Sequence, residues 1–139
     1  MSEPRAEAYP ALWPVPTRWS DDDTAYAAYF ATAVGGWLMA STGLDIRTLA
    51  AVAVVAESAC RFVRDIAFPD QLHVGLSVDH LDDDRVEYAL AIFREDPDGD
   101  LEVAATGRLV HRYVDPVTRQ PAPIPPEIRS AALLLTEPV

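Results

Sequence analysis

A chain of 139 residues, half of them hydrophobic, can bury one core but not two, so a single domain over 1–139 is expected, with flexible ends at about 1–10 and 136–139. The 22 acidic residues outnumber 11 basic ones, all arginine, and the net charge of −11 disfavours a nucleic-acid partner, which needs a basic surface. Without an apolar leader or an apolar run of about 20 residues, we expect no membrane segment and a cytoplasmic location, which the single cysteine, Cys60, also favours.

The first predicted elements are a short strand near 15–19 and a long helix. Apolar residues recur at the i, i+3, i+4, i+7 spacing of one helical face, at Tyr26, Tyr29, Phe30, Ala33, Val34, Trp37 and Leu38. Asp22 or Asp23 stands at the N-cap, and Gly43 at the C-terminal end. Within the helix, Gly35 and Gly36 each cost about 1 kcal/mol relative to Ala, so we expect another backbone to approach closely there.

After the helix the apolar period changes to two, which predicts strands. One face of the first strand would carry Val52, Val54, Ala56, Ser58, Cys60 and Phe62, and the other Glu57, Arg61 and Asp65. Further strands are predicted at 72–78, 86–92 and 101–114, separated by turns at 82–84 and 96–100, and a short helix from 125 to 135 ends the pattern. Because the strands follow one another, we expect antiparallel hairpins. The result is an α+β domain in which a curved antiparallel sheet wraps around one long helix and leaves an edge strand for a second copy.

Six motifs follow one another along the chain: PTRWSDDD at 16–23, YAAYFATA at 26–33, VAESACRF at 55–62, FPDQLHVG at 68–75, GRLVHRYVD at 107–115 and RQPAPIP at 119–125. In order and spacing they resemble the hotdog-fold acyl-CoA thioesterases of the 4-hydroxybenzoyl-CoA thioesterase type. That resemblance implies the hotdog fold, a homodimer or homotetramer, an acyl-CoA or acyl-carrier thioester as substrate, and no separate cofactor. Family members usually carry Gly-His-Val-Asn-Asn before the helix tyrosine, whereas only Thr24 and Ala25 separate Asp23 from Tyr26 here.

Thioester hydrolysis needs a base or nucleophile and hydrogen-bond donors at the oxygen that becomes negative. The resemblance assigns the first role to Asp23, the second aspartate of its Asp-x-Asp pattern, as nucleophile or activator of water. A helix N-terminus supplies unpaired N–H groups, so the donors would be those of Thr24, Ala25 and Tyr26. The three adjacent carboxylates at 21–23 are equally explained by an N-cap with two solvated charges.

Other candidate residues each have a structural explanation as well. Tyr26 and Tyr29, together with Phe30 and Trp37, belong to the core and could line an acyl tunnel. Glu57 and Ser58 could face a substrate cleft, or Glu57 could pair with Arg61. Four arginines on the later strands could bind the phosphates of CoA. Alternatively, they could form cross-strand ion pairs with Glu and Asp. These residues are Arg61, Arg64, Arg108 and Arg112. Cys60 is expected in the core, and the three histidines lack metal-site spacing, so no metal is expected.

Two functions remain open at this point. The first is an acyl-CoA thioesterase acting through Asp23. The second is a non-catalytic hotdog protein that binds an acyl thioester or a partner chain after loss of the active-site loop. A hotdog dehydratase would need a histidine and a carboxylate on the central helix, and 26–40 contains neither. A cone-shaped α+β barrel would begin with several helices, and this pattern shows one.

Overall fold

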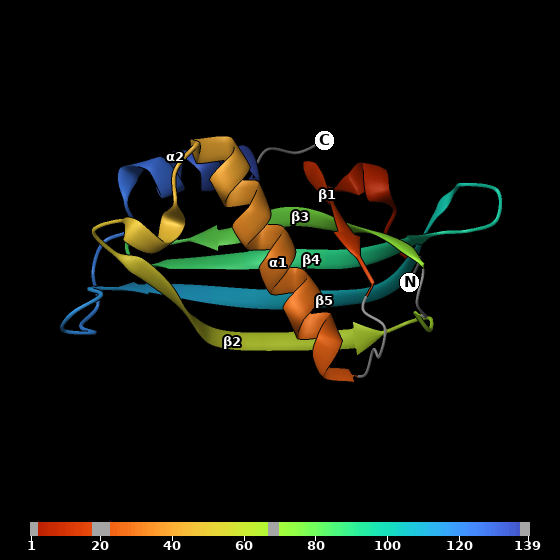
Figure 1. Ribbon diagram of the computed structural model, residues 1–139, viewed down its shortest axis with the longest axis horizontal. Coiled ribbons are helices and arrows are strands. Elements are labelled where there is room, and N and C mark those ends of the chain that lie inside the picture. Colours follow the sequence, from red (N-terminus) through yellow and green to blue (C-terminus); the bar gives the residue numbers. More distant parts are fainter. Residues whose placement is uncertain (1–2, 18–22, 67–69, 137–139) are drawn as a thin grey trace.

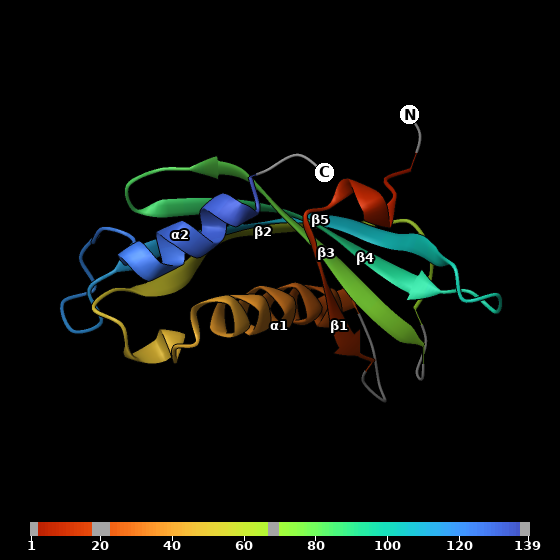
Figure 2. The ribbon, with the colours of Figure 1, turned by 90° about the horizontal axis from the view of Figure 1, so that it is seen from above.

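A computed structural model describes residues 3–17, 23–66 and 70–136, with residues 23–25 described by their backbone alone. The elements in chain order are η1 (Ala6–Ala8), β1 (Ala11–Pro16), α1 (Asp23–Thr42), η2 (Ile46–Thr48), β2 (Val52–Phe62), β3 (Gln71–Leu81), β4 (Arg85–Glu95), β5 (Leu101–Val114) and α2 (Pro126–Leu134). The strands form one antiparallel sheet in the order β1-β3-β4-β5-β2. α1 crosses one face of this sheet, which arches over the helix (Figures 1 and 2). This is the predicted hotdog architecture, and the fold prediction is confirmed.

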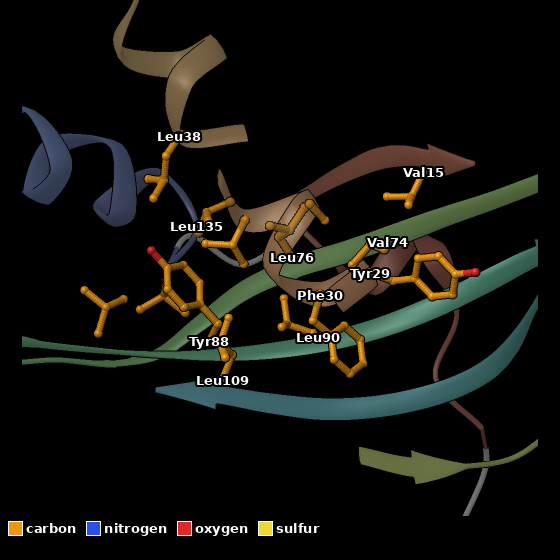
Figure 3. Close-up of a cluster of buried hydrophobic side chains, with 14 of the residues drawn as sticks. Val15, Tyr29, Phe30, Leu38, Val74, Leu76, Tyr88, Leu90, Leu109 and Leu135 are labelled. Carbon is orange, nitrogen blue, oxygen red and sulfur yellow. The ribbon is translucent and has the colours of Figure 1, made fainter. Parts of the chain in front are cut away.

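The core lies between α1 and the sheet and uses the predicted helical stripe. Figure 3 shows these side chains meeting those of β3, β4 and β5. The buried members of the stripe are Tyr26, Tyr29, Phe30, Ala33, Val34 and Leu38, and their partners on the strands include Val74, Leu76, Tyr88, Leu90 and Leu109. Trp37 is half-buried and packs against the same cluster. The aromatic residues of the helix therefore serve the core, as expected for apolar side chains at this spacing.

The two helix glycines have different surroundings. A Cβ on Gly36 would lie 2.8 Å from ring atoms of Trp13 in β1, so this glycine lets the strand's side chain approach the helix. The expected close approach therefore exists at Gly36, but it is made by a side chain and not by a backbone. A Cβ on Gly35 would meet nothing within 4 Å, so internal packing does not explain this residue.

β1 and β2 depart from the sequence expectation in position and pairing. β1 spans Ala11–Pro16 and not 15–19, and Trp19 lies outside the described residues. Its prolines are tolerated because β1 is an edge strand, where alternate N–H groups have no ladder partner. β2 forms no hairpin with β3 but pairs with β5 at the opposite edge of the sheet. The short turns at 82–84 and 96–100, in contrast, make β3, β4 and β5 neighbours in the sheet as well as in sequence, as expected.

A β-bulge in β2 changes which side chains face the helix. The register against β5 shifts between Val55 and Glu57, so one residue of β2 is left without an opposite partner. Before the bulge, Ala53 lies opposite the buried Tyr113, and after it Ser58 lies opposite the buried Leu109. Val52 and Val54 therefore do not share a face with Ser58, contrary to the prediction. An extra residue in one strand reverses the alternation, and composition does not reveal where it occurs.

Candidate active site

The N-terminus of α1 is the predicted site of catalysis. The helix begins at Asp23, as expected, and its first N–H groups have no acceptor within the helix and carry the positive end of its dipole. Asp21 and Asp22 lie outside the described residues, and the side chains of Asp23, Thr24 and Ala25 are not described. The catalytic role of Asp23 and the donor roles of Thr24 to Tyr26 stay predictions.

The first described side chain of the helix, Tyr26, packs against the end of β2. Its ring meets that of Phe62 edge-on, with centroids 4.6 Å apart. Tyr26 is 7% exposed, whereas Phe62 is 49% exposed, so the contact stands at the border between core and surface. One turn on, Tyr29 is only 2% exposed and lies within the core. The start of α1 is thus fixed beside the C-terminal end of the edge strand, where Figure 1 shows the two elements approaching each other.

Glu57 and Ser58 lie on opposite faces of β2. Glu57 points to the face away from α1, where Arg108 of β5 forms ion pairs with both Glu57 and Glu87. The hydrogen bond from the Arg108 guanidinium holds the pKa of Glu87 below its ordinary value. Glu57 therefore has the strand-pairing role considered above, although its partner is Arg108 and not Arg61. Ser58 shares the helix-facing side of β2 and is exposed.

The arginines proposed for CoA phosphates differ in how they are paired. Arg108 lies between two carboxylates, and Arg112 Nε lies 3.7 Å from an oxygen of Asp84. Arg64 contacts Glu3 and Glu102. Arg61 is exposed on β2, and among the described residues no carboxylate forms an ion pair with it.

A cavity of about 390 Å³ lies between α1, η2, β2 and β5. Ala31 and Gly35 form its helix side, Ala53 its β2 side, and His111 and Tyr113 its floor on β5. This volume falls within the range of small-molecule sites. Figure 1 shows the ribbons of α1 and β2 separating toward the C-terminal half of the helix, away from the contact of Tyr26 with Phe62.

His111 was not identified from the sequence as a site residue. Its ring meets that of Tyr88 edge-on, with centroids 5.5 Å apart, and its Nδ1 atom is buried without a hydrogen-bond partner. Burial lowers the pKa of His111 to about 4, so the imidazole is neutral at pH 7. The alternation Leu109, His111, Tyr113 already placed this histidine on a core-facing side, and that was the pattern from which it could have been found.

Two classes of site are not seen in the part of the chain that the structure describes. Residues 3–17, 23–66 and 70–136 contain no group of three or more His, Cys, Asp or Glu side chains arranged to hold a metal ion. Within the same residues, no helix combines the length and apolar character needed to cross a bilayer.

Comparison with known proteins gives consistent matches along the chain. The model of the Thioesterase-like superfamily matches residues 15–132. The PA5185 protein from Pseudomonas aeruginosa strain PAO1 is 35% identical, with 96% of each chain covered and a TM-score of 0.88. Slr0204, a 1,4-dihydroxy-2-naphthoyl-CoA thioesterase from Synechocystis, is 16% identical, with 91% of this chain and 98% of that chain covered and a TM-score of 0.76. An aspartate-to-asparagine variant of 4-hydroxybenzoyl CoA thioesterase complexed with 4-hydroxybenzoyl CoA is 12% identical, covers 88% of this chain and 97% of that chain, and has a TM-score of 0.72. No curated protein matches the chain.

Proposed function

Because the chain belongs to the Thioesterase-like superfamily, we propose that it hydrolyses acyl-CoA thioesters and that Asp23 attacks the thioester or activates the attacking water. Thioester hydrolysis as the class of reaction is confirmed by the family match over residues 15–132. The alternative of a non-catalytic binding protein is not favoured. The proposal for Asp23 is carried by one observation, its position as the first residue of α1.

The start of α1 offers the two kinds of group that thioester hydrolysis requires, hydrogen-bond donors and a carboxylate. Unpaired N–H groups of the first turn would donate hydrogen bonds to the thioester carbonyl, and the helix dipole would favour negative charge on that oxygen. Water adds a hydroxyl to the carbonyl carbon, the C–S bond breaks, and the CoA thiol leaves with the remaining proton. A carboxylate at position 23 would accept the proton from water or attack the carbonyl carbon itself.

CoA is proposed as the carrier of the acyl group for two reasons. The names of two structural neighbours specify CoA thioesters as their substrates. In addition, a net charge of −11 would repel an acidic carrier protein over a long range. Arg61, exposed on β2 and without an ion pair among the described residues, is then the arginine most available to a CoA phosphate, because Arg108 already lies between Glu57 and Glu87.

Release of free thiol from a panel of thioesters tests this function. Short, long and aromatic acyl-CoAs are incubated with the protein, alongside the same acyl groups on a carrier protein. We expect thiol release from at least one acyl-CoA, and slower release from the matching carrier thioester. Binding of acyl-CoA without thiol release from any substrate would contradict the proposal and restore the non-catalytic function.

A homodimer joined through β2 is part of the proposal. Among the described residues β2 pairs only with β5, so its outer edge has no partner strand there, and an unpaired strand edge favours pairing with a second copy about a twofold axis. Val55, 57% exposed near the middle of this strand, would lie at the join. The partner would also cover the open side of the gap between α1 and β2.

Replacing Val55 with Lys is expected to weaken self-association by about tenfold, because a charge in the centre of an interface is poorly tolerated. Sedimentation velocity over a range of concentrations measures the change and separates dimer from tetramer. Val117→Lys is the matched control, since Val117 is 86% exposed and lies in the turn after β5, outside the strands. A wild-type chain that sediments as a monomer at all concentrations would rule out the pairing.

A further inference from the structure

The N-terminal segment 3–10 covers part of the outer face of the sheet, the face opposite to α1. Figure 2 shows η1 and α1 on opposite sides of the sheet. Ala6 and Tyr9 pack against three strand residues that are at most 2% exposed, Ala91, Phe93 and Val103. These three residues form a hydrophobic cluster of their own, separate from the core beneath α1. The burial of this cluster therefore depends on the N-terminal segment.

The ring of Tyr9 holds the segment against the strands. It meets the ring of Phe93 edge-on, with centroids 5.7 Å apart. It also lies directly over Gly75 of β3, where a Cβ would come within 2.7 Å of Tyr9 Cγ. A residue larger than glycine at position 75 would displace the ring, so the strand leaves the space that the tyrosine fills. Burial raises the pKa of Tyr9 above its ordinary value, which agrees with a phenol packed against the protein.

An ion pair holds the beginning of the segment. Arg64 Nη1 lies 3.0 Å from Glu3 Oε1 and also donates a 2.7 Å hydrogen bond to the carbonyl oxygen of Val103. The side chains of Arg64 and Glu3 are 33% and 52% exposed, and partly exposed ion pairs contribute little to stability. The segment is thus held mainly by one aromatic ring and one weak ion pair. A segment held in this way opens at a lower free energy than the whole domain.

The surface beneath the segment has the composition of a protein interface. Phe93 and Val103 supply an apolar centre, and an apolar patch with a polar rim is typical of surfaces that bind another protein. His73 lies opposite Phe93 in the ladder, and its Nε2 atom is 3.0 Å from Glu95 Oε1. Arg108, on the same face, forms ion pairs with two carboxylates. Because these charged side chains are paired, the repulsion expected between two chains of net charge −11 is reduced on this face.

A second copy of the chain is the partner that this surface fits. In a contact about a twofold axis each copy presents the same patch, so one apolar patch supplies both sides of the interface. Two sheets that pack face to face, about 10 Å apart, bury such patches against each other. The proposed contact through β2 uses a strand edge and not the outer face, so both contacts can exist in one assembly.

We propose that the outer face around Phe93 is a docking surface for a second copy of the chain, and that segment 3–10 lies on it and keeps it closed. Release of the segment lets two outer faces pack together, with Phe93 and Val103 of each copy at the centre, and doubles the mass of the assembly. The inference goes beyond the proposed hydrolysis of thioesters. Its test uses no measurement of activity, so either proposal can fail without the other.

The test uses full-length variants and two measurements. Trypsin cleavage after Arg5, followed by mass spectrometry, reports release of the segment, because a protease needs the chain in an open conformation. Sedimentation velocity over a range of concentrations gives the association constant for the doubling of mass. Tyr9→Ser removes the ring, and we expect the cleavage rate and this association constant each to rise at least about tenfold, since the open fraction limits both. Tyr9→Phe keeps the ring and should match the wild-type protein in both.

A second substitution locates the contact. Tyr9→Ser combined with Phe93→Ser should keep the fast cleavage but return the association constant to within about twofold of the wild-type value, because the apolar centre is lost. Fast cleavage of Tyr9→Ser without stronger association would overturn the docking surface, as would heterogeneous aggregates in place of one species of doubled mass. Stronger association that persists in the double variant would place the contact elsewhere and reject it as well. Unchanged cleavage in Tyr9→Ser would show that its ring does not hold the segment closed.

Glu3→Gln keeps the test decisive if a Tyr9 variant fails to fold, which thermal unfolding of each variant reveals. This substitution removes only the partly exposed ion pair with Arg64 and leaves every apolar contact in place. We expect the cleavage rate and the association constant to rise together by about threefold. A rise in cleavage alone, or no change in either quantity, would count against the segment as a cover of the outer face.

Discussion

Replacing Asp23 with Asn is expected to lower kcat for acyl-CoA hydrolysis by about 10²- to 10⁴-fold, with little change in KM. Asparagine has nearly the same shape as aspartate but neither attacks a thioester nor accepts a proton from water at neutral pH. The N–H groups at the start of α1 remain in the variant, so binding of the carbonyl is retained. Rates of thiol release under saturating substrate measure the effect, and a single-turnover experiment separates hydrolysis from product release.

The same substitution separates catalysis from helix capping. Asparagine is as good an N-cap as aspartate, so a residue that only caps α1 would leave both stability and rate nearly unchanged on replacement. Asp22→Asn is the matched control, because it removes the same charge one residue away. We expect it to reduce the rate by less than about tenfold. Full activity in Asp23→Asn, or an equal loss in both variants, would remove Asp23 from the reaction.

The helix and its core face could be predicted because they depend on local spacing. The recurrence of apolar residues from Tyr26 to Leu38 identified the stripe that the structure buries, and Gly43, with a φ of 70°, ends the helix where a glycine was expected to. Four strands were likewise found from alternation, and the 101–114 strand matches β5 in its bounds. Side chains repeat about every 3.6 residues along a helix and every 2 along a strand because of the backbone geometry. These repeats can therefore be recognised in the sequence without knowledge of tertiary contacts.

Pairing across the sheet could not be predicted in the same way. Nothing in the composition of 52–62 indicates that β2 joins β5, nor that a bulge beside Val55 places Val52 and Val54 on the face opposite to that of Ser58. One extra residue in a strand reverses the facing of every residue beyond it. Beyond the bulge the predicted alternation holds, so Ser58 lies on the helix-facing side and Glu57 pairs with Arg108 on the opposite face.

The cavity is formed by residues from separate elements, and the sequence predicts other roles for two of them. Gly35 was expected to admit a neighbouring backbone, and His111 was considered only as a metal ligand. The structure brings them together because α1 and β2 diverge away from the contact of Tyr26 with Phe62. That Gly35 and His111 line the same cavity depends on how the helix crosses the sheet.

Gly107→Ala is expected to destabilise the fold by about 3 kcal/mol, at the upper end for an overpacked core. Gly107 lies on β5 beneath α1, and a Cβ there would come within 2.6 Å of Phe30 Cζ and 2.8 Å of the Ala59 carbonyl oxygen. Phe30 is only 2% exposed and cannot swing away, and the carbonyl belongs to the paired strand β2. The helix must therefore lift or β2 must shift. Urea unfolding at constant pH measures the loss in free energy.

A second substitution tests that cause. Phe30→Leu shortens the side chain above Gly107, so the double variant should recover at least about 1 kcal/mol relative to the sum of the two single losses. Gly35→Ala is the control for adding a methyl group to a glycine, because its Cβ meets nothing within 4 Å, and helix propensity predicts equal or greater stability. Strict additivity in the double variant would show that Phe30 is not what the new methyl group displaces. Phe30 lies about two turns after Asp23 on α1. If the double variant recovers both stability and the rate of thiol release, the packing of α1 against β5 affects the position of Asp23.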